Sequence, residues 1–163
     1  MKYLPQRKSN RLKDYDYSNA GYYFLTICVK DRYNLLGRIH SDNTVILSKH
    51  GKIVKERIET IAGYFPYSSV VKYVIMPNHI HLIIRLSNND NLADSNNRTN
   101  MTIPRIVSTF KRLSNKEIGF NLWQRSYHDH IIRNEEEYTM IWDYIENNPA
   151  NWTKDCFFNA KND

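Results

Sequence analysis

The chain has 163 residues, of which 41% are hydrophobic and 25% are charged, as expected of one globular domain that buries its own core. Lys and Arg total 23 against 17 Asp and Glu, and the net charge of +6 permits a polyanionic partner. No apolar run reaches the length of a membrane span, the first residues lack a signal-peptide pattern, and the two cysteines form no disulfide framework. We therefore expect a soluble cytoplasmic protein without membrane contact.

Residues 1–20 are interpreted as a basic N-terminal arm. It contains Arg7, Lys8, Arg11 and Lys13, and no acidic residue occurs among the first 13 positions. Several tyrosines lie nearby, and basic side chains beside aromatic rings suit single-stranded nucleic acid, which exposes both phosphates and unstacked bases. A solvated basic tail would explain the same composition.

The first part of the domain alternates between strand and helix patterns. Aromatic and β-branched residues predict a strand at 22–29, and a short strand is predicted at 44–47 after a turn-like segment. From Ser48 to about Tyr64, isoleucines and valines recur at helical spacing between Lys and Glu, which predicts an amphipathic helix.

Two strong strand patterns follow at 69–76 and 79–86, separated by Pro77 and Asn78. Such a close junction indicates an antiparallel hairpin in the centre of a sheet. Residues 87–100 are almost entirely polar, so we expect a mobile loop there.

The last third of the chain predicts two more helices. The first spans about 102–118, and residues 121–133 form either a strand or an extended segment. Asn134 is a typical N-cap and is followed by three glutamates, which favour the positive end of a helix dipole. Pro149 ends this helix, because the residue before a proline avoids helical geometry.

This order of elements predicts an α+β sandwich with a mostly antiparallel central sheet and helices packed on it. The strand at 79–86 is expected to be central. In this interpretation the domain spans residues 21–150, and residues 151–163 form a C-terminal tail.

The pair His79 and His81 is a candidate metal site. On a strand, residues i and i+2 point to the same face, so both imidazoles can share one ion while Ile80 packs into the core. An HxH pattern alone is weak evidence, and a second copy exists at His128 and His130. We favour the first pair because an apolar strand carries it, and we expect the second to be a packing or DNA-facing surface.

Tyr144 and Asn148 are four residues apart on the last helix and therefore share one side of it. The helix has an apolar stripe that should bury, formed by Tyr138, Ile141, Trp142 and Ile145. If this helix packs across the metal face of the sheet, Tyr144 and Asn148 approach the histidine pair together. A tyrosine beside a metal can attack a phosphate and keep the phosphodiester energy in a covalent bond.

Several segments together resemble REP-associated tyrosine transposases of the HUH single-tyrosine superfamily. They are Arg7-Lys8-Ser9 and Tyr23-Phe24-Leu25-Thr26-Ile27-Cys28 near the start, Met76-Pro77-Asn78-His79-Ile80-His81 in the middle, and Trp123-Gln124-Arg125-Ser126-Tyr127 and Tyr144-Ile145 with Asn147-Asn148-Pro149 towards the end. They cover nearly the whole chain in the same order.

The resemblance implies a ferredoxin-like (RNA-recognition-motif-like) fold and a bacterial enzyme of DNA transposition and recombination. His79 and His81 would be its metal ligands, Tyr144 its nucleophile and Asn148 its third ligand. The implied reaction is nicking and joining of single-stranded DNA near palindromic hairpins through a 5′-phosphotyrosine. The implied cofactor is Mg²⁺ or Mn²⁺, with no small-molecule cofactor, and the protein would associate with the nucleoid through its DNA.

DNA contacts are expected from the arm and from six further residues. These are Arg105, Lys111, Arg112, Arg125, Tyr127 and Arg133. Tyr127 is also the second choice for the nucleophile, because it lies in a basic segment.

Two other functions fit the same chain. One is a catalytically silent binder of hairpin DNA or RNA. The other is a metal-dependent hydrolase in which Tyr144 is structural, although the scattered acidic residues do not suggest a carboxylate cluster. One tyrosine per chain allows a monomer or a homodimer.

Overall fold

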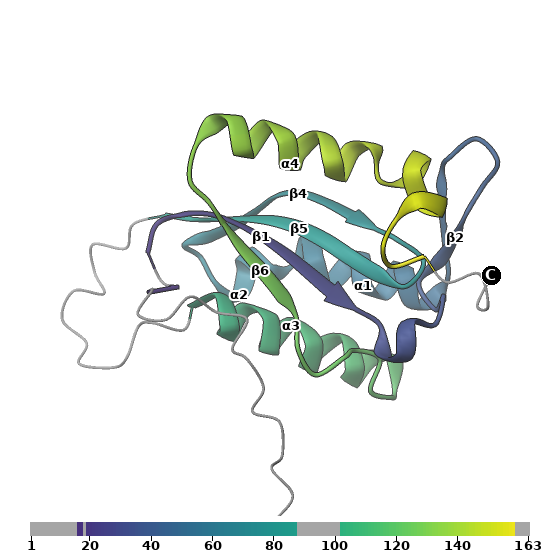
Figure 1. The fold of residues 1–163 in the computed structure, drawn as a ribbon. Coiled ribbons are helices and arrows are strands. Elements are labelled where there is room, and N and C mark those ends of the chain that lie inside the picture. Colours follow the sequence, from purple (N-terminus) through teal and green to yellow (C-terminus); the bar gives the residue numbers. More distant parts are fainter. Residues whose placement is uncertain (1–15, 18, 88–101, 159–163) are drawn as a thin grey trace, which may run out of the picture.

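The computed structural model describes residues 16–17, 19–87 and 102–158 (Figure 1). The basic residues of the predicted arm (Arg7, Lys8, Arg11 and Lys13) lie outside the described residues, and so does all of the predicted polar loop except Ser87.

The centre of the fold is a four-stranded antiparallel sheet in the order β4-β5-β1-β6. Its strands are β1 (Gly21–Cys28), β4 (Ser68–Ile75), β5 (His79–Leu86) and β6 (His128–Ile132). Strand β5 lies between β4 and β1, so the prediction of a central strand for the histidine pair is confirmed.

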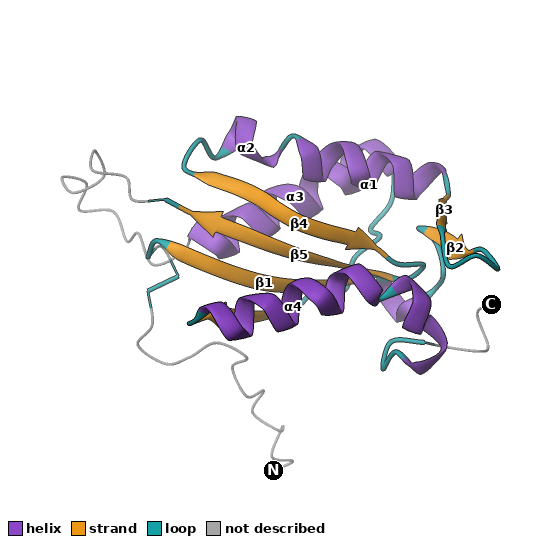
Figure 2. Ribbon diagram, turned by 90° about the horizontal axis from the view of Figure 1, so that it is seen from above, coloured by secondary structure: helices purple, strands orange, loops and turns teal. Residues whose placement is uncertain are grey.

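Helices cover both faces of this sheet (Figures 1 and 2). Helices α1 (Lys49–Glu59) and α3 (Thr102–Ile118) lie on one face with the short α2 (Ile61–Tyr64), and α4 (Glu135–Asn147) lies on the other. The four strands with α1 and α3 follow the β-α-β-β-α-β order of a ferredoxin-like fold, and α4 is added to its open face. The predicted α+β sandwich is confirmed.

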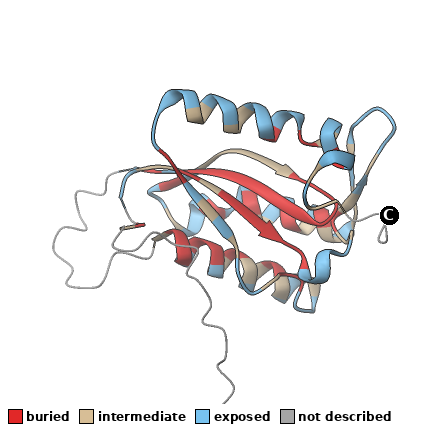
Figure 3. Ribbon diagram, in the orientation of Figure 1, coloured by how far each residue is buried: buried red, intermediate tan, exposed pale blue. Residues whose placement is uncertain are grey.

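Alternation along β5 creates two different environments. Ile80, Leu82 and Ile84 belong to the large core beneath α1 and α3, whereas Ile83 packs with Ile145 of α4 on the opposite face. All of β5 except Arg85 is buried (Figure 3). The apolar stripe predicted for the last helix packs against this second cluster, as expected.

Several details differ from the predicted elements. The helix expected to Tyr64 is interrupted at Thr60, whose hydroxyl bonds back to the carbonyl of Glu56. The short strand β3 (Val45–Leu47) pairs with β2 (Gly37–Ile39) in a separate two-stranded sheet, and a 3₁₀ helix, η1 (Lys30–Arg32), follows β1. Only the last residues of the 121–133 segment form a strand. After α4 the chain continues as a second 3₁₀ helix, η3 (Pro149–Lys154). Within the described residues, no helix is long and apolar enough to cross a membrane.

Candidate active site: a histidine pair beneath a tyrosine helix

The imidazoles of His79 and His81 face each other on the α4 side of the sheet. Their Nε2 atoms are 3.0 Å apart, and both residues are almost completely buried, at 0% and 1% exposure. The two-residue spacing on β5 places them on one face, as predicted. The structure therefore brings the predicted pair together with its ring nitrogens converging.

His79 is oriented from behind by the neighbouring Asn78. Its Nδ1 lies 2.9 Å from the amide oxygen of Asn78, while the Asn78 amide nitrogen donates to the carbonyls of Phe157 and Arg32. Because those two carbonyls only accept, the amide oxygen must be the atom that faces His79, and Nδ1 of His79 carries the proton. Its Nε2 then presents a lone pair toward His81.

His81 has an equivalent support on the next strand. Its Nδ1 lies 2.8 Å from Oγ1 of Thr26, its partner across the β1–β5 ladder, and the ring of Phe24 stacks on it. When Nδ1 donates to Thr26, Nε2 of His81 is also a free ligand atom.

Burial keeps both imidazoles neutral. It lowers the pKa of His79 to about 3, with the positive charge of Arg32 adding to the effect. Burial and the neighbouring His79 hold the pKa of His81 well below its usual value. Neutral imidazole is the form that binds metals, so the pair is in its ligand state at physiological pH.

The spacing of the two nitrogens fits the predicted kind of ion. Two ligands at about 2.1 Å from one ion and at right angles to each other are about 3.0 Å apart, which is the edge of an octahedron. The observed separation of the Nε2 atoms is 3.0 Å. The spacing of the pair is therefore compatible with a shared divalent ion.

Helix α4 carries the two other predicted residues over the histidines. It begins at its N-cap Asn134, whose side chain accepts from the backbone of Glu137, and it is anchored to the sheet by the buried Ile145. Because of this docking, the hydroxyl of Tyr144 lies 3.2 Å from Nε2 of His81. Tyr144 thus contacts the same nitrogen that faces His79.

Tyr144 is partly open to solvent, at 42% exposure, whereas the histidines beneath it are not. Burial, followed by the nearby Asp155, raises the pKa of Tyr144 to about 12. The phenol is therefore protonated at neutral pH in the metal-free protein. A cation among these residues would favour the phenolate, because it reverses the local electrostatics.

Asn148 is buried beside Tyr144, at 2% exposure. Its amide nitrogen donates to Oδ2 of Asp155 at 2.9 Å, and no described residue offers a hydrogen-bond partner to its amide oxygen. A buried acceptor without a partner is costly unless something else satisfies it. An amide oxygen is a suitable ligand for Mg²⁺ or Mn²⁺, so the position fits the predicted third ligand.

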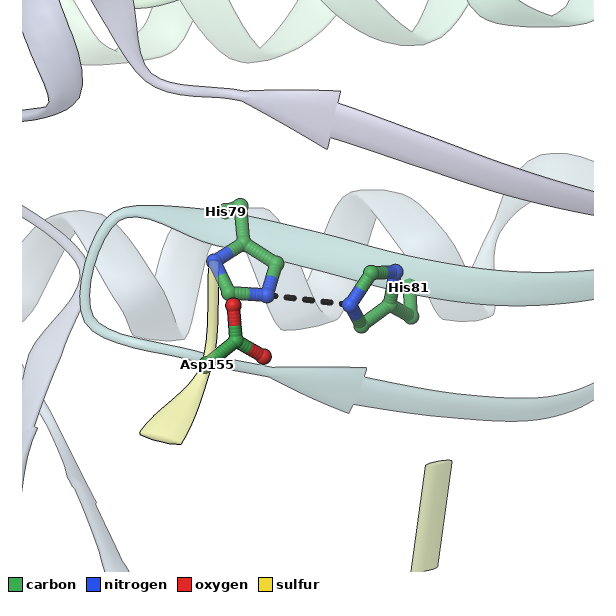
Figure 4. A group of neighbouring side chains, drawn as sticks. All are labelled: His79, His81 and Asp155. Carbon is green, nitrogen blue, oxygen red and sulfur yellow. Dashed lines mark hydrogen bonds between the residues drawn. The ribbon is translucent and has the colours of Figure 1, made fainter. Parts of the chain in front are cut away.

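The sequence analysis did not identify Asp155, which reaches the site from the segment after η3. One of its oxygens, Nε2 or Nδ1 of His79 and a ring nitrogen of His81 all lie within 4.8 Å of one another (Figure 4). The same segment places Phe157 against His79, with ring centroids 4.5 Å apart. The segment assigned to a tail therefore contributes to the site.

The second histidine pair lies on the edge strand β6 of the same sheet. His130 makes an ion pair with Glu137 of α4, and His128 is exposed. His130 thus packs on α4, and contact of this pair with DNA stays a prediction.

The predicted DNA contacts outside the arm lie in several regions. Arg105 and Arg112 are exposed on α3, across the sheet from α4, and Arg125 and Arg133 are exposed before and after β6. The Lys111 ammonium donates to the carbonyls of Gln124, Arg125 and Ser126 and lies over the Tyr127 ring, which packs at the α3 side of the core. Contact of these six residues with DNA stays a prediction.

Comparisons with known proteins identify the family of the chain. The model of the family described as "Transposase IS200 like" matches residues 17–148. An uncharacterized protein of Haemophilus influenzae is 39% identical, over 95% of this chain and 94% of that protein. A second protein of the same organism, named "Putative REP-associated tyrosine transposase", is 27% identical over 83% of this chain and 73% of its own length.

Two solved structures share the fold. A structure of the REP-associated tyrosine transposase bound to a REP hairpin matches with a TM-score of 0.64 and 22% identity, over 87% of this chain and 73% of that one. The crystal structure of a transposase-like protein from Deinococcus radiodurans matches with a TM-score of 0.50 and 21% identity, over 84% of this chain and 97% of that one.

The resemblance to REP-associated tyrosine transposases is thereby confirmed. The matched family region contains β1, the histidine strand and the tyrosine helix as far as Asn148. The chain belongs to the IS200-like transposase family.

Proposed function

We propose that this transposase cuts and rejoins single-stranded DNA next to palindromic hairpins, using Tyr144 as the nucleophile. The observation that carries this proposal is the contact of 3.2 Å between the Tyr144 hydroxyl and Nε2 of His81. This contact supports the proposal, because a phenolic oxygen beside a nitrogen that would hold the metal could act with that metal on one phosphate.

His79, His81 and Asn148 are proposed to hold Mg²⁺ or Mn²⁺. Two neutral imidazoles whose Nδ1 atoms are engaged by Asn78 and Thr26, and one buried amide oxygen without a described partner, support this ligand set. Such an ion would polarise the scissile phosphate and stabilise the leaving 3′ oxygen.

In the proposed step, the phenolic oxygen of Tyr144 forms a bond to phosphorus and loses its proton. The bond between phosphorus and the 3′ oxygen breaks, and that oxygen leaves as a 3′-hydroxyl. The product is a 5′-phosphotyrosine, and a second 3′-hydroxyl can reverse the step to join strands. The exposure of Tyr144 supports access by DNA. The exposed arginines at both ends of β6 are proposed to contact the DNA backbone.

The test uses a labelled single-stranded hairpin oligonucleotide, Mn²⁺ or Mg²⁺, and denaturing gels that reveal a covalent protein–DNA adduct. We expect Tyr144→Phe to abolish the adduct, because it removes the attacking oxygen, while DNA binding is retained. Tyr127→Phe is the matched control and should leave the adduct unchanged. An adduct that persists in the first variant and disappears in the second would refute the assignment. A wild-type protein that binds the hairpin without any adduct would favour the silent binder.

A further inference from the structure

We propose that Asp155 is a ligand of the same metal ion, so that the segment after η3 supplies a negatively charged donor to the site. This inference rests on the proposed function, because it concerns the ion expected at His79 and His81. It adds a carboxylate to a ligand set that otherwise consists of neutral groups.

The Asp155 carboxylate and ring nitrogens of both histidines converge on one space. The Asp155 carboxylate shares a region 4.8 Å across with ring nitrogens of both histidines (Figure 4). Asn78 and Thr26 engage the Nδ1 atoms of the two imidazoles, and the two Nε2 atoms contact each other at 3.0 Å. A divalent cation at this point would be held by two imidazole nitrogens and a negatively charged oxygen, all of which are suitable ligands.

Asp155 is paired with Asn148, the predicted third ligand. The Asn148 amide nitrogen donates to Oδ2 of Asp155. The amide oxygen of Asn148 is buried and has no hydrogen-bond partner among the described residues. One cation can satisfy both that oxygen and the carboxylate. A carboxylate keeps lone pairs available while it accepts hydrogen bonds, so the bond from Asn148 does not prevent coordination.

Hydrogen bonds within its own segment hold the Asp155 carboxylate in place. Oδ1 of Asp155 accepts from the backbone of Phe157 at 2.7 Å, and the Phe157 carbonyl accepts from the Asn78 amide. Arg32 lies over the Phe157 ring and donates to the Cys156 carbonyl. Asp155 is therefore preorganised by the same Asn78 that orients His79, as expected of a ligand with its own supporting contacts.

The ligand set would then contain two imidazoles, one amide oxygen and one carboxylate. An octahedral ion bound in this way keeps two positions for phosphate oxygens. The carboxylate would lower the total charge of the ion and its ligands from +2 to +1. It would therefore favour metal binding in the absence of DNA. Carboxylates suit Mg²⁺ and Mn²⁺, whereas imidazoles suit Ni²⁺, so loss of Asp155 should affect the two kinds of ion unequally.

The experiment measures metal binding to the full chain by isothermal titration calorimetry, with Mn²⁺ or Ni²⁺ alone and no DNA. We expect Asp155→Asn to weaken Mn²⁺ binding by about tenfold or more and Ni²⁺ binding by less than about threefold. Asp143→Asn, an exposed position on α4 with the same change of charge, is the matched control and should change neither.

Three results would overturn the inference. Unchanged Mn²⁺ binding in Asp155→Asn would show that the carboxylate is not a ligand, and if that variant still forms the DNA adduct, the proposed function stands. Equal weakening for both ions would show that Asp155 only holds its segment in place. A wild-type protein that neither binds Mn²⁺ nor forms the adduct would overturn the proposed function itself.

Discussion

At the scale of single residues, the site depends on groups that support the proposed metal ligands from behind. Asn78 and Thr26 engage the Nδ1 atoms of His79 and His81 at 2.9 and 2.8 Å. They hold each ring in the orientation that directs Nε2 toward its partner. Such supporting contacts commonly determine metal affinity as strongly as the ligands themselves.

Thr26→Val tests this role, because valine has nearly the same shape and lacks the hydroxyl. We expect Mn²⁺ affinity to fall by about 10- to 100-fold, since His81 loses the partner that fixes its ring. Isothermal titration measures the change. Thr139→Val, on the exposed side of α4, is the control. Equal Mn²⁺ affinities in both variants would show that Thr26 does not support the metal site.

Residue spacing explains which parts of the site could be predicted. His79 and His81 are two apart on a strand, and Tyr144 and Asn148 are four apart on a helix, so each pair shares a face in any fold that keeps those elements. Asp155 has no such relation to the histidines. It follows a 3₁₀ helix whose path is determined by tertiary packing, including the burial of Trp152. A sequence pattern carries no information on that path.

At the scale of elements, the position of α4 determines whether Tyr144 meets the histidines. Its contact with the sheet is a small apolar cluster in which Ile145 is 1% exposed and packs with Ile83 and Ile132. Lys72 of β4 adds an ion pair with Glu146 and lies over the ring of Trp142. The docking of one short helix therefore positions both Tyr144 and Asn148.

Ile145→Ala should lower the free energy of unfolding by about 2–5 kcal/mol, because it leaves a cavity in this small cluster. Urea denaturation followed by circular dichroism measures the loss. Met140→Ala, at a position with 60% exposure on the same helix, should change stability little. Similar values for the two variants would show that α4 does not depend on this contact.

Element prediction succeeded where the apolar pattern was long. The predicted bounds of β4, β5 and α4 differ from the observed ones by one residue at most. In these elements the alternation or the helical stripe extends over eight residues or more. The sequence Gly37-Arg38-Ile39 was not recognised as a strand, since three residues show no periodicity. The interruption of the first helix at Thr60 was also missed, because its apolar spacing continues across that position.

At the scale of the whole molecule, the histidines are buried between the sheet of the ferredoxin-like core and α4, which covers the open face of that sheet. The neutral state of both imidazoles is a consequence of this burial. It links the site to the stability of the entire fold, because the unfolded chain takes up protons at these positions that the folded protein rejects.

This linkage predicts the pH dependence of stability in the presence of EDTA. Unfolded histidines titrate near about 6.5, whereas burial lowers the pKa of His79 to about 3. Between these values the unfolded state binds more protons, so the free energy of unfolding should fall as the pH is lowered from about 6.5 toward about 3. It should not depend on these groups above about 6.5.

Urea titrations at a series of pH values measure this slope. His79→Gln should flatten it between about pH 6.5 and 5.5, where carboxylates contribute little. His128→Gln, at an exposed position, should leave it unchanged. An identical slope in the two variants would contradict a depressed pKa at His79.

The overall fold could be predicted from the order of elements, but the DNA surface could not. Basic residues on α3 and around β6 face different directions, and a charge count does not show which of them meets a phosphate. Lys111 illustrates the difficulty, because its ammonium bonds to three carbonyls of its own chain. Its sequence context resembles that of exposed Arg112.

The central claim is that Tyr144 becomes covalently attached to DNA beside the histidine pair. Its most direct test is mass spectrometry of proteolytic peptides after incubation with a single-stranded hairpin oligonucleotide and Mn²⁺. We predict a nucleotide on the peptide that contains Tyr144, and its absence when His79 is replaced by Ala. A nucleotide on another tyrosine, or on Tyr144 to the same extent in the His79→Ala variant, would contradict the account.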